Sequence, residues 1–386
     1  MQTDMHYYGT YAMARAAGIT PKASQIIATC AQFVDDNASD KTLKFANGAW
    51  VESVATAHHA LDTENLNLSD QRRVWIPFHF LPGNEGDSWT ERLKCRMDSP
   101  LVREMTNHHL SLHSSSYGIE LIGIAAHVYA DTFSHYGFSG ISSRGNRIIS
   151  DSIALNNLEP EIETYVRQKF ARFKSKKGSK LRPNFRTSVS GGTGAFSRFK
   201  NTVMSFFAQN LSGGLGHGAV ATFPDRPYLE WAFDYERSDA YLQGLNNGST
   251  TNAIRPNPDT FLKGCEALHT LFSNFRKCRP DLDNKDYRKF SAIKATVNDV
   301  LHVQADMAGR IEAWHKAAAS GLVFDSPTTI PIYRGVEWND EWAKLDGDEN
   351  SDILLDKPIW HFHQAAAVHR TYVLRDLLPS YGIVVN

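Results

Sequence analysis

The 386-residue chain carries 41 Lys and Arg against 42 Asp and Glu, so its net charge gives no overall attraction for nucleic acid or anionic membrane. The apolar fraction of 42% and the charged fraction of 22% are ordinary for a globular protein, and the length allows a large core. No run approaches about 18 apolar residues, and no basic segment precedes an apolar one at the N-terminus. We therefore expect neither a transmembrane segment nor a secretory signal.

The four cysteines lie far apart, with no CxxC pair. This spacing is typical of reduced thiols in a cytosol-like compartment rather than of a disulfide framework. The sequence thus predicts a cytoplasmic protein, with export by a signal-independent route, as an effector, left open as an alternative.

Helical signals dominate the chain. A first helix is predicted from Thr10 to Ala17, and Thr20-Pro21 then begins a second that reaches Asp36. A third helix is expected before His58-His59. Further helices are predicted at residues 101–113, in a long segment ending near 138, and at residues 160–173, 259–277, 285–319 and 357–378. The best strand signals, residues 321–324 and 330–333, have prolines beside or inside them, and prolines also make residues 75–82 read as an extended or turn segment.

These patterns predict an all-α protein with a single large multi-helix domain. We expect a metal-binding, hydrolase-like core in residues 1–250 and a C-terminal helical extension, residues 251–386, packed on it. Residues 174–195 are basic, rich in Ser and Gly and poor in apolar residues, which predicts a flexible loop. Such a loop is either a solvated linker or a surface that attracts an anionic substrate.

The most informative segment is His127-Val-Tyr-Ala-Asp131-Thr-Phe-Ser-His135. Residues four apart lie on one face of an α-helix, so its two imidazoles and its carboxylate form a single line. The preceding residues, 117–126, are mostly apolar, so the helix is expected to be buried. Buried polar groups need partners, and a metal ion supplies one to all three; the alternative is a His–Asp hydrogen-bond network without an ion.

Other imidazoles and carboxylates lie where a core helix seldom places them. They are His6, Asp35, Asp36, His58, His59, His217 and Asp225. Imidazole and carboxylate ligands without thiolates suit Zn²⁺, Mn²⁺ or Fe, and one carboxylate can bridge two ions. His108, His109 and His113 also have helical spacing, but their neighbours favour a structural role.

The order of these residues resembles that of the bacterial zinc-dependent phospholipases C and the fungal zinc-dependent single-strand nucleases, an all-α superfamily with a cluster of three zinc ions. The resemblance implies that His127 binds one zinc and that Asp131 bridges two. It also implies Asp36 (or Asp35) and His59 (or His58) in the first site, His6 in the second, and His135 with His217 in the third. Residues 5–15, 32–36 and 130–138 also resemble an uncharacterised bacterial family of unknown function.

The chain departs from the zinc superfamily at two positions. Members usually begin with a tryptophan whose amine and carbonyl bind metal, whereas this chain has Met1 there and Asp4 as the candidate replacement. The superfamily's last histidine is followed one turn later by glutamate, but His217 is followed by Ala221, and Asp225 comes two turns after it. Two ions are therefore as compatible with the sequence as three.

The resemblance implies hydrolysis of a phosphoester by a metal-activated water, with Asp35 orienting or deprotonating that water and Asp131 bridging the ions. The substrate would be a phospholipid head group, a nucleotide or a nucleic acid, met through transient membrane or nucleic-acid contact. An HD-type nucleotide phosphohydrolase is a second possibility, although no His-Asp dipeptide occurs in the chain. The third is a non-catalytic protein with a structural His/Asp metal site.

Overall fold

The computed structural model describes residues 1–39, 41–57, 71–141, 143, 146, 148–168, 171, 220, 222–235, 253–324 and 327–385. Within these residues the protein is mainly helical, with two small antiparallel sheets. The helical elements are η1 (Asp4–Gly9), α1 (Thr10–Ala16), α2 (Pro21–Asp36), η3 (Gln71–Trp75), α4 (Ile76–Phe78), α5 (Trp89–Arg92), α6 (Pro100–Ser111), α7 (Gly118–His135), residues 160–168, α12 (Asn257–Cys278), η5 (Pro280–Leu282), α13 (Phe290–Leu301), α14 (Met307–Ala319), α15 (Gly335–Lys344), η6 (Ser351–Asp356), α16 (Pro358–Tyr372), η7 (Val373–Leu377) and α17 (Leu378–Ser380).

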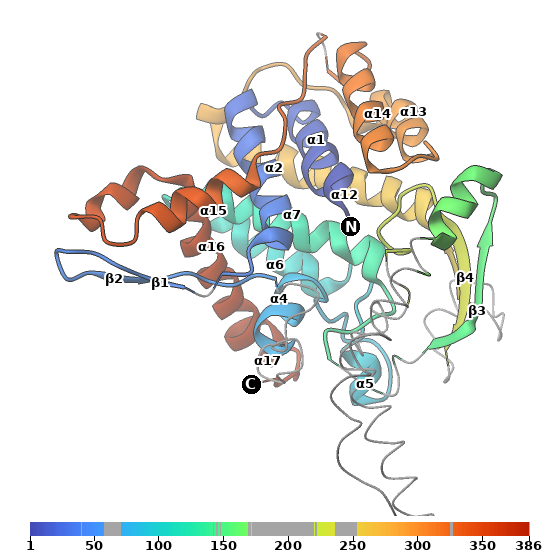
Figure 1. The fold of residues 1–386 in the computed structure, drawn as a ribbon, viewed down its shortest axis with the longest axis horizontal. Coiled ribbons are helices and arrows are strands. Elements are labelled where there is room, and N and C mark those ends of the chain that lie inside the picture. The colour runs from blue at the N-terminus through green and yellow to red at the C-terminus, as the bar shows by residue number, and fades with distance from the viewer. Residues whose placement is uncertain are drawn as a thin grey trace, which may run out of the picture.

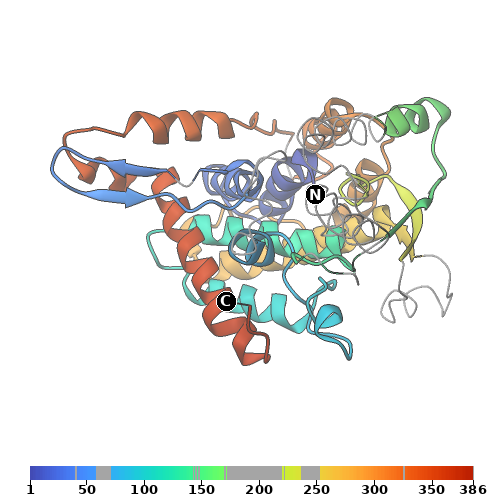
Figure 2. The same cartoon turned by 60° about the horizontal axis from the view of Figure 1, so that its bottom comes forward.

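Helix α7 is the centre of the molecule, and α2, α6, α12 and α16 pack around it (Figure 1). It is mostly apolar and buried along nearly its whole length, as expected of a helix surrounded by other helices. The view in Figure 2 shows the same helix between α1 and α2 on one side and α6 on the other. Polar groups on α7 therefore face the interior.

Helix α2 approaches α7 unusually closely at Gly123. A Cβ atom built on Gly123 would lie 2.5 Å from Cβ of Cys30 and 2.7 Å from the carbonyl oxygen of Ile27. Only glycine fits such a contact without moving the backbone of α2. This approach brings the C-terminal end of α2 beside the middle of α7.

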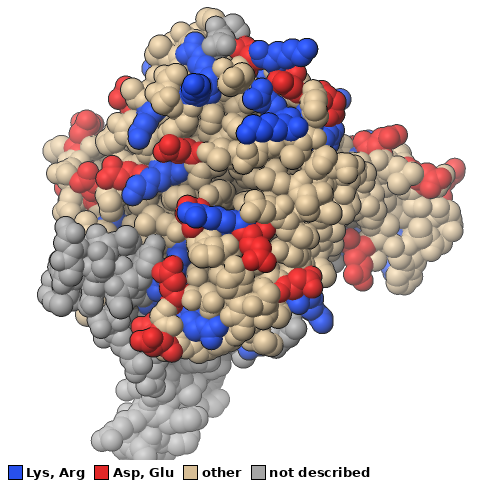
Figure 3. Space-filling model, turned by 180° about the vertical axis from the view of Figure 1, so that it is seen from behind, with Lys and Arg blue, Asp and Glu red and all other residues tan. Residues whose placement is uncertain are grey.

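The sheets lie at opposite sides of the helical core. One is the hairpin of β1 (Thr42–Lys44) and β2 (Trp50–Glu52), which projects from the core together with α15. The other orders β3 (Ile148–Asn156), β4 (Glu230–Tyr235) and β5 (Ala253–Pro256) in an antiparallel sheet. Seen from behind in Figure 3, the charged side chains on the projecting arm are mainly acidic, while many Lys and Arg side chains lie at the upper end of the molecule.

The predicted helix before His58-His59 is wrong for the described residues, because the hairpin occupies that position. Gly48 adopts a φ of 88° and donates its N–H to the Phe45 carbonyl. The Asn47-Gly48 pair is a strong hairpin signal that outweighs the helical propensity around it. The predicted strands at residues 321–324 and 330–333 are also wrong, since both segments are irregular.

Two other predictions need correction. The continuous helix expected over residues 285–319 is two helices, α13 and α14, because the Asp306 side chain accepts the Gly309 N–H and begins α14 anew. Residues 75–82, expected to be an extended or turn segment, include the short helix α4, with Pro77 in its first turn, where no N–H is needed; the residues after α4 are not helical.

The C-terminal third contributes directly to the main core. Phe261, Leu268 and Phe272 of α12 pack with residues of α1 and α7, and Phe362 of α16 packs with α2. The division at residue 250 stays a prediction. All four cysteines are free thiols. Among the described helices, none is long and apolar enough to cross a lipid bilayer.

Candidate metal centre

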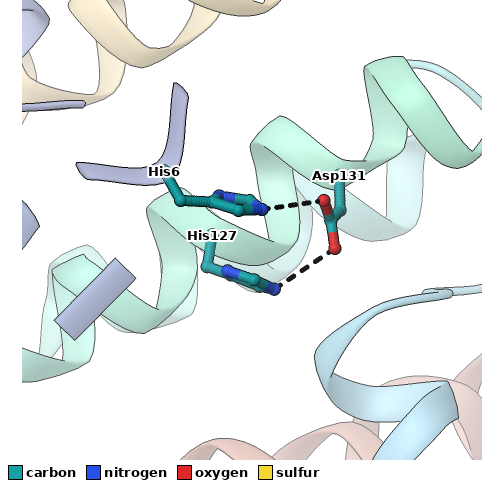
Figure 4. A group of neighbouring side chains, drawn as sticks. All are labelled: His6, His127 and Asp131. Carbon is teal, nitrogen blue, oxygen red and sulfur yellow. Dashed lines mark ion pairs between the residues drawn. The ribbon is translucent and has the colours of Figure 1, made fainter. Parts of the chain in front are cut away.

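A cluster of histidines and carboxylates lies where η1, the end of α2 and the residue after α4 meet α7. Its members are His6, Asp35, His79, His127, Asp131 and His135. All are buried except Asp35, whose side chain is 30% exposed. Three of them are drawn in Figure 4, where the stacked rings of His6 and His127 point at the two different oxygens of Asp131.

Asp131 is the common neighbour of the four imidazoles. Its Oδ1 lies 3.1 Å from Nε2 of His6. Its Oδ2 lies 3.2 Å from Nε2 of His127, 3.3 Å from Nδ1 of His135 and 3.5 Å from Nδ1 of His79. One carboxylate thus offers each oxygen to a different group of nitrogen atoms, the arrangement that a bridging ligand needs.

Backbone carbonyls decide which nitrogen of each ring carries the proton. His127 donates Nδ1–H to the Ala31 carbonyl over 2.6 Å, and His79 donates Nε2–H to the Thr56 carbonyl over 2.8 Å. A carbonyl only accepts, so in the neutral rings Nε2 of His127 and Nδ1 of His79 carry lone pairs. These two lone pairs face each other across 3.2 Å, beside the Asp131 carboxylate. The space between them could hold a cation.

His135 is oriented in the same way. It donates Nδ1–H to the carbonyl of His79 over 2.9 Å, which turns Nε2 toward Oδ1 of Asp225 at 3.1 Å. The α-amino group of Met1 lies between the same acids, 2.7 Å from Oδ1 of Asp131 and 3.2 Å from Oδ1 of Asp225. Burial opposes its charge, yet the carboxylates raise its pKa to about 11.

The acid at the centre of the cluster is held ionised. Burial alone would raise the pKa of Asp131, but the charges of His135, the Met1 amine and His127 outweigh burial and bring the pKa well below its usual range. Asp131 therefore stays a carboxylate, the form that binds metal.

The surrounding groups are shifted in different directions. Burial and the neighbouring His127 bring the pKa of His6 well below its usual value, so His6 is neutral. Burial also works against the charge of His127, but Asp131 and Asp35 raise its pKa. Burial raises the pKa of Asp35, against the opposing influence of His127 and His79. A proton and a metal ion would compete for the same lone pair on His127.

Two sets of ligand atoms within this cluster are close enough to hold an ion. In each set, the ligand atoms all lie within 4.8 Å of one another. One set is His6, His127 and Asp131, and the other is Asp35, His79 and His127.

A buried arginine fixes the end of α7, the helix that supplies three of the six residues of this cluster. Arg255 of β5 donates to the carbonyls of Ser134 and Tyr136 over 2.6 and 2.7 Å, and its guanidinium lies 3.7 Å from the centre of the Tyr136 ring. A cation at a helix C-terminus is favoured by the helix dipole. The sheet of β3, β4 and β5 thereby holds the last turn of α7, which contains His135.

The structure brings together six of the residues singled out from the sequence: His6, Asp35, His127, Asp131, His135 and Asp225. It does not bring Asp36 to them. Asp36 is exposed and accepts hydrogen bonds from the Tyr333 hydroxyl over 2.6 Å and from Gln32 over 3.4 Å. Neighbouring positions on a helix point in different directions, so only one of the two acids can face α7. His59, with its alternative His58, and His217 lie outside the described residues, as does the whole predicted loop at residues 174–195.

Sequence reasoning missed His79, which belongs to none of the predicted helices. Its one signal is a histidine between two aromatic residues in a segment bounded by prolines, Pro77-Phe78-His79-Phe80, which is weak evidence alone. Asp4 does not join the cluster, because it pairs with Arg310 over 2.6 Å.

The fold and the site define a mainly helical protein with a buried His/Asp cluster that could hold metal ions. The chain belongs to a family of unknown function, DUF6765, whose model matches residues 1–377. No curated protein and no solved structure matches it. The comparisons therefore assign no activity.

Proposed function

We propose that the protein binds two or three divalent ions, most suitably zinc, in this cluster and hydrolyses phosphoester bonds. The observation that carries the proposal is the convergence of imidazole lone pairs and carboxylates on one buried space. Without a cation, the lone pairs of His79 and His127 repel each other and the charge on Asp131. A metal ion converts each of these repulsions into a bond.

The geometry supports a division of ligands among the ions. One ion would be held by His79, His127 and Asp35, and a second by His6, with Asp131 bridging the two. His135 and Asp225 would serve a third. Ligand sets of nitrogen and oxygen without thiolate are typical of hydrolytic zinc sites, where the ion polarises water and the oxygen atoms of the substrate.

Two observations favour catalysis over a purely structural role. The donor order resembles that of the zinc-dependent phospholipases C and single-strand nucleases, with Asp131 in the bridging position. The cluster also reaches solvent at Asp35, whose side chain is 30% exposed. There Asp35 could orient an attacking water. The deep burial of His6, His127 and Asp131 instead favours the alternative, a structural metal site.

The substrate class follows from the same resemblance. A phospholipid head group, a nucleotide and a nucleic acid all present the phosphodiester or phosphomonoester that such ions would contact. Contact with a membrane or with nucleic acid would then be transient.

The test combines metal analysis with turnover of bis(p-nitrophenyl) phosphate by purified protein. We expect two or three zinc ions per chain and hydrolysis that Asp131→Asn abolishes together with bound metal. Asp36→Asn is the matched control, since it removes an adjacent carboxylate outside the cluster, and it should retain both. Metal-loaded protein that is inert toward phosphodiesters, nucleic acids and phospholipids would refute the hydrolase; protein that takes up no metal would refute the metal centre as well.

A further inference from the structure

A second group of buried histidines lies on the other side of α4 from the cluster. His108 and His109 belong to α6, and His369 belongs to α16. His109 and His369 are both 0% exposed, and His108 is half-buried with its ring stacked on Tyr372 at a centroid distance of 3.5 Å. No carboxylate or thiol takes part in the hydrogen bonds described for these three histidines.

The three rings form a continuous hydrogen-bonded chain. Nδ1 of His108 lies 3.0 Å from Nδ1 of His109, and Nε2 of His109 lies 2.8 Å from Nδ1 of His369. Nε2 of His369 lies 2.8 Å from the carbonyl oxygen of Pro77. The chain therefore connects the surface of α6 to the backbone of α4.

The carbonyl at the inner end sets the direction of every bond. Since it only accepts, His369 donates Nε2–H to Pro77 and must accept at Nδ1. His109 then donates Nε2–H to His369 and accepts at Nδ1, so His108 donates Nδ1–H. Burial brings the pKa of His369 to about 4 and that of His109 well below its usual value, so both stay neutral as this pattern requires. The chain ends on a group that takes no proton, so it holds a position and does not conduct protons.

The position that it holds is the backbone next to the metal centre. Pro77 precedes His79 by two residues, and His79 contributes both its ring nitrogen to the cluster and its carbonyl to Nδ1 of His135. A shift of this backbone would therefore displace two of the proposed ligands together.

We propose that His109 and His369 are positioning residues for the metal centre: by fixing the Pro77 carbonyl they aim His79 and, through its carbonyl, His135. This inference rests on the proposed metal centre and adds residues to it that lie outside the ligand set. Groups that orient ligands through hydrogen bonds commonly affect metal affinity about 10–100-fold.

The experiment compares His369→Phe, which keeps the ring volume but loses both hydrogen bonds, with His369→Gln, which keeps a donor for the Pro77 carbonyl. Zinc affinity is measured by chelator competition, and the visible spectrum is recorded for the Co²⁺-loaded protein. We expect His369→Phe to bind zinc about 10–100-fold more weakly with an altered Co²⁺ spectrum, and His369→Gln to recover most of both. His302→Gln, at an exposed histidine bonded only to its own helix, is the control and should match wild type.

Three outcomes would overturn the proposal. Wild-type affinity and spectrum in His369→Phe, even with a lower melting temperature, would leave the chain a packing feature only. If that variant does not fold, ¹⁵N spectra of wild-type histidines decide instead: an Nδ1–H tautomer at His369 contradicts the proposed direction, and the Nε2–H tautomer supports it. Wild-type protein that binds no divalent ion would overturn the metal centre and the positioning role together, whereas the first outcome would overturn the positioning role alone.

Discussion

The molecule has two buried groups of histidines, one around Asp131 and one from His108 to His369. They differ in the hydrogen-bond partners of their ring nitrogens. In the His108–His369 chain each ring donates to the next, no carboxylate takes part, and the last bond ends on a carbonyl. Around Asp131, carbonyls take up the N–H groups of His79 and His127, and the remaining lone pairs face each other and a carboxylate. The first arrangement needs no ion, whereas in the second the lone pair on Nε2 of His127 is free to take a proton or a metal ion. The direction of the bonds, rather than the number of histidines, distinguishes a closed hydrogen-bonded chain from a cluster that could hold a metal ion.

Metal removal should have the largest effect and should divide the two groups. A ligand at 1,000 times its Kd stabilises the folded state by about 4 kcal/mol. We expect chelation to lower the free energy of unfolding by that order in wild type and to leave Asp131→Asn nearly unchanged. In ¹⁵N spectra, the His127 signals should move on chelation, while His109 and His369 keep their tautomers. Equal shifts of the ¹⁵N signals in both histidine groups would contradict the claim that only the group around Asp131 binds metal.

Glu120, in the first turn of α7, is a buried ionisable group outside both histidine groups. It is only 4% exposed, and its Oε2 has no hydrogen-bond partner among the described residues. Burial raises its pKa to about 7, above the usual 4.5. The folded state then holds the proton more tightly than the unfolded chain, so stability is complete below pH 4.5 and falls as the pH rises through 7. The loss is about 3 kcal/mol.

Glu120→Gln should remove that loss. Its melting temperature should exceed that of wild type at pH 8 and approach it at pH 4, measured over a series of buffers. Glu312→Gln, at an exposed position of α14, should show no such trend. A constant difference between Glu120→Gln and wild type at all pH values would refute the assigned protonation change.

Gly123→Ala should affect one histidine group and spare the other. The added Cβ would meet the Ile27 carbonyl and Cys30, forcing α2 away from α7 at a cost of about 2 kcal/mol. Because α2 carries Asp35 and the Ala31 carbonyl that orients His127, zinc affinity should fall as well, as measured by chelator competition. The tautomers of His108, His109 and His369 should not change. A change in them would show that the two histidine groups are coupled.

The smallest effect is expected at the Asp36–Tyr333 contact. Tyr333→Phe removes one hydrogen bond to an exposed carboxylate and should cost about 1 kcal/mol or less in urea unfolding. Its metal content, like that of Asp36→Asn, should equal wild type. Asp35→Asn should lose metal. Metal loss in Asp36→Asn with retention in Asp35→Asn would reverse the assignment of the two acids.

The sequence was sufficient for those parts of the site that lie on one helix. The spacing of His127, Asp131 and His135 follows from the helical repeat, and the apolar flanks predict burial. The sequence could not show which of Asp35 and Asp36 joins the cluster. That depends on the rotation of α2 about its own axis where it packs against α7, at the close approach that Gly123 permits. The side chain that faces α7 is decided by packing.

Contacts made over long sequence distances were out of reach. The Thr56 carbonyl orients the ring of His79, and His369 contacts the Pro77 carbonyl of α4; neither contact has a local signature in the sequence. The sheet that supplies Arg255 pairs strands separated by many residues, whose short alternating patterns were not recognised. The hairpin at Asn47-Gly48 had a local signal that was overlooked.

The central claim is that ions lie between the rings of His79 and His127 and beside Asp131. Anomalous diffraction from a crystal grown with zinc, recorded on both sides of the zinc absorption edge, tests it most directly. The account predicts peaks within bonding distance of Nε2 of His127 and Nδ1 of His79, with a further peak on the other oxygen of Asp131. A map without such peaks, in which these nitrogens and carboxylates keep the same arrangement, would contradict it.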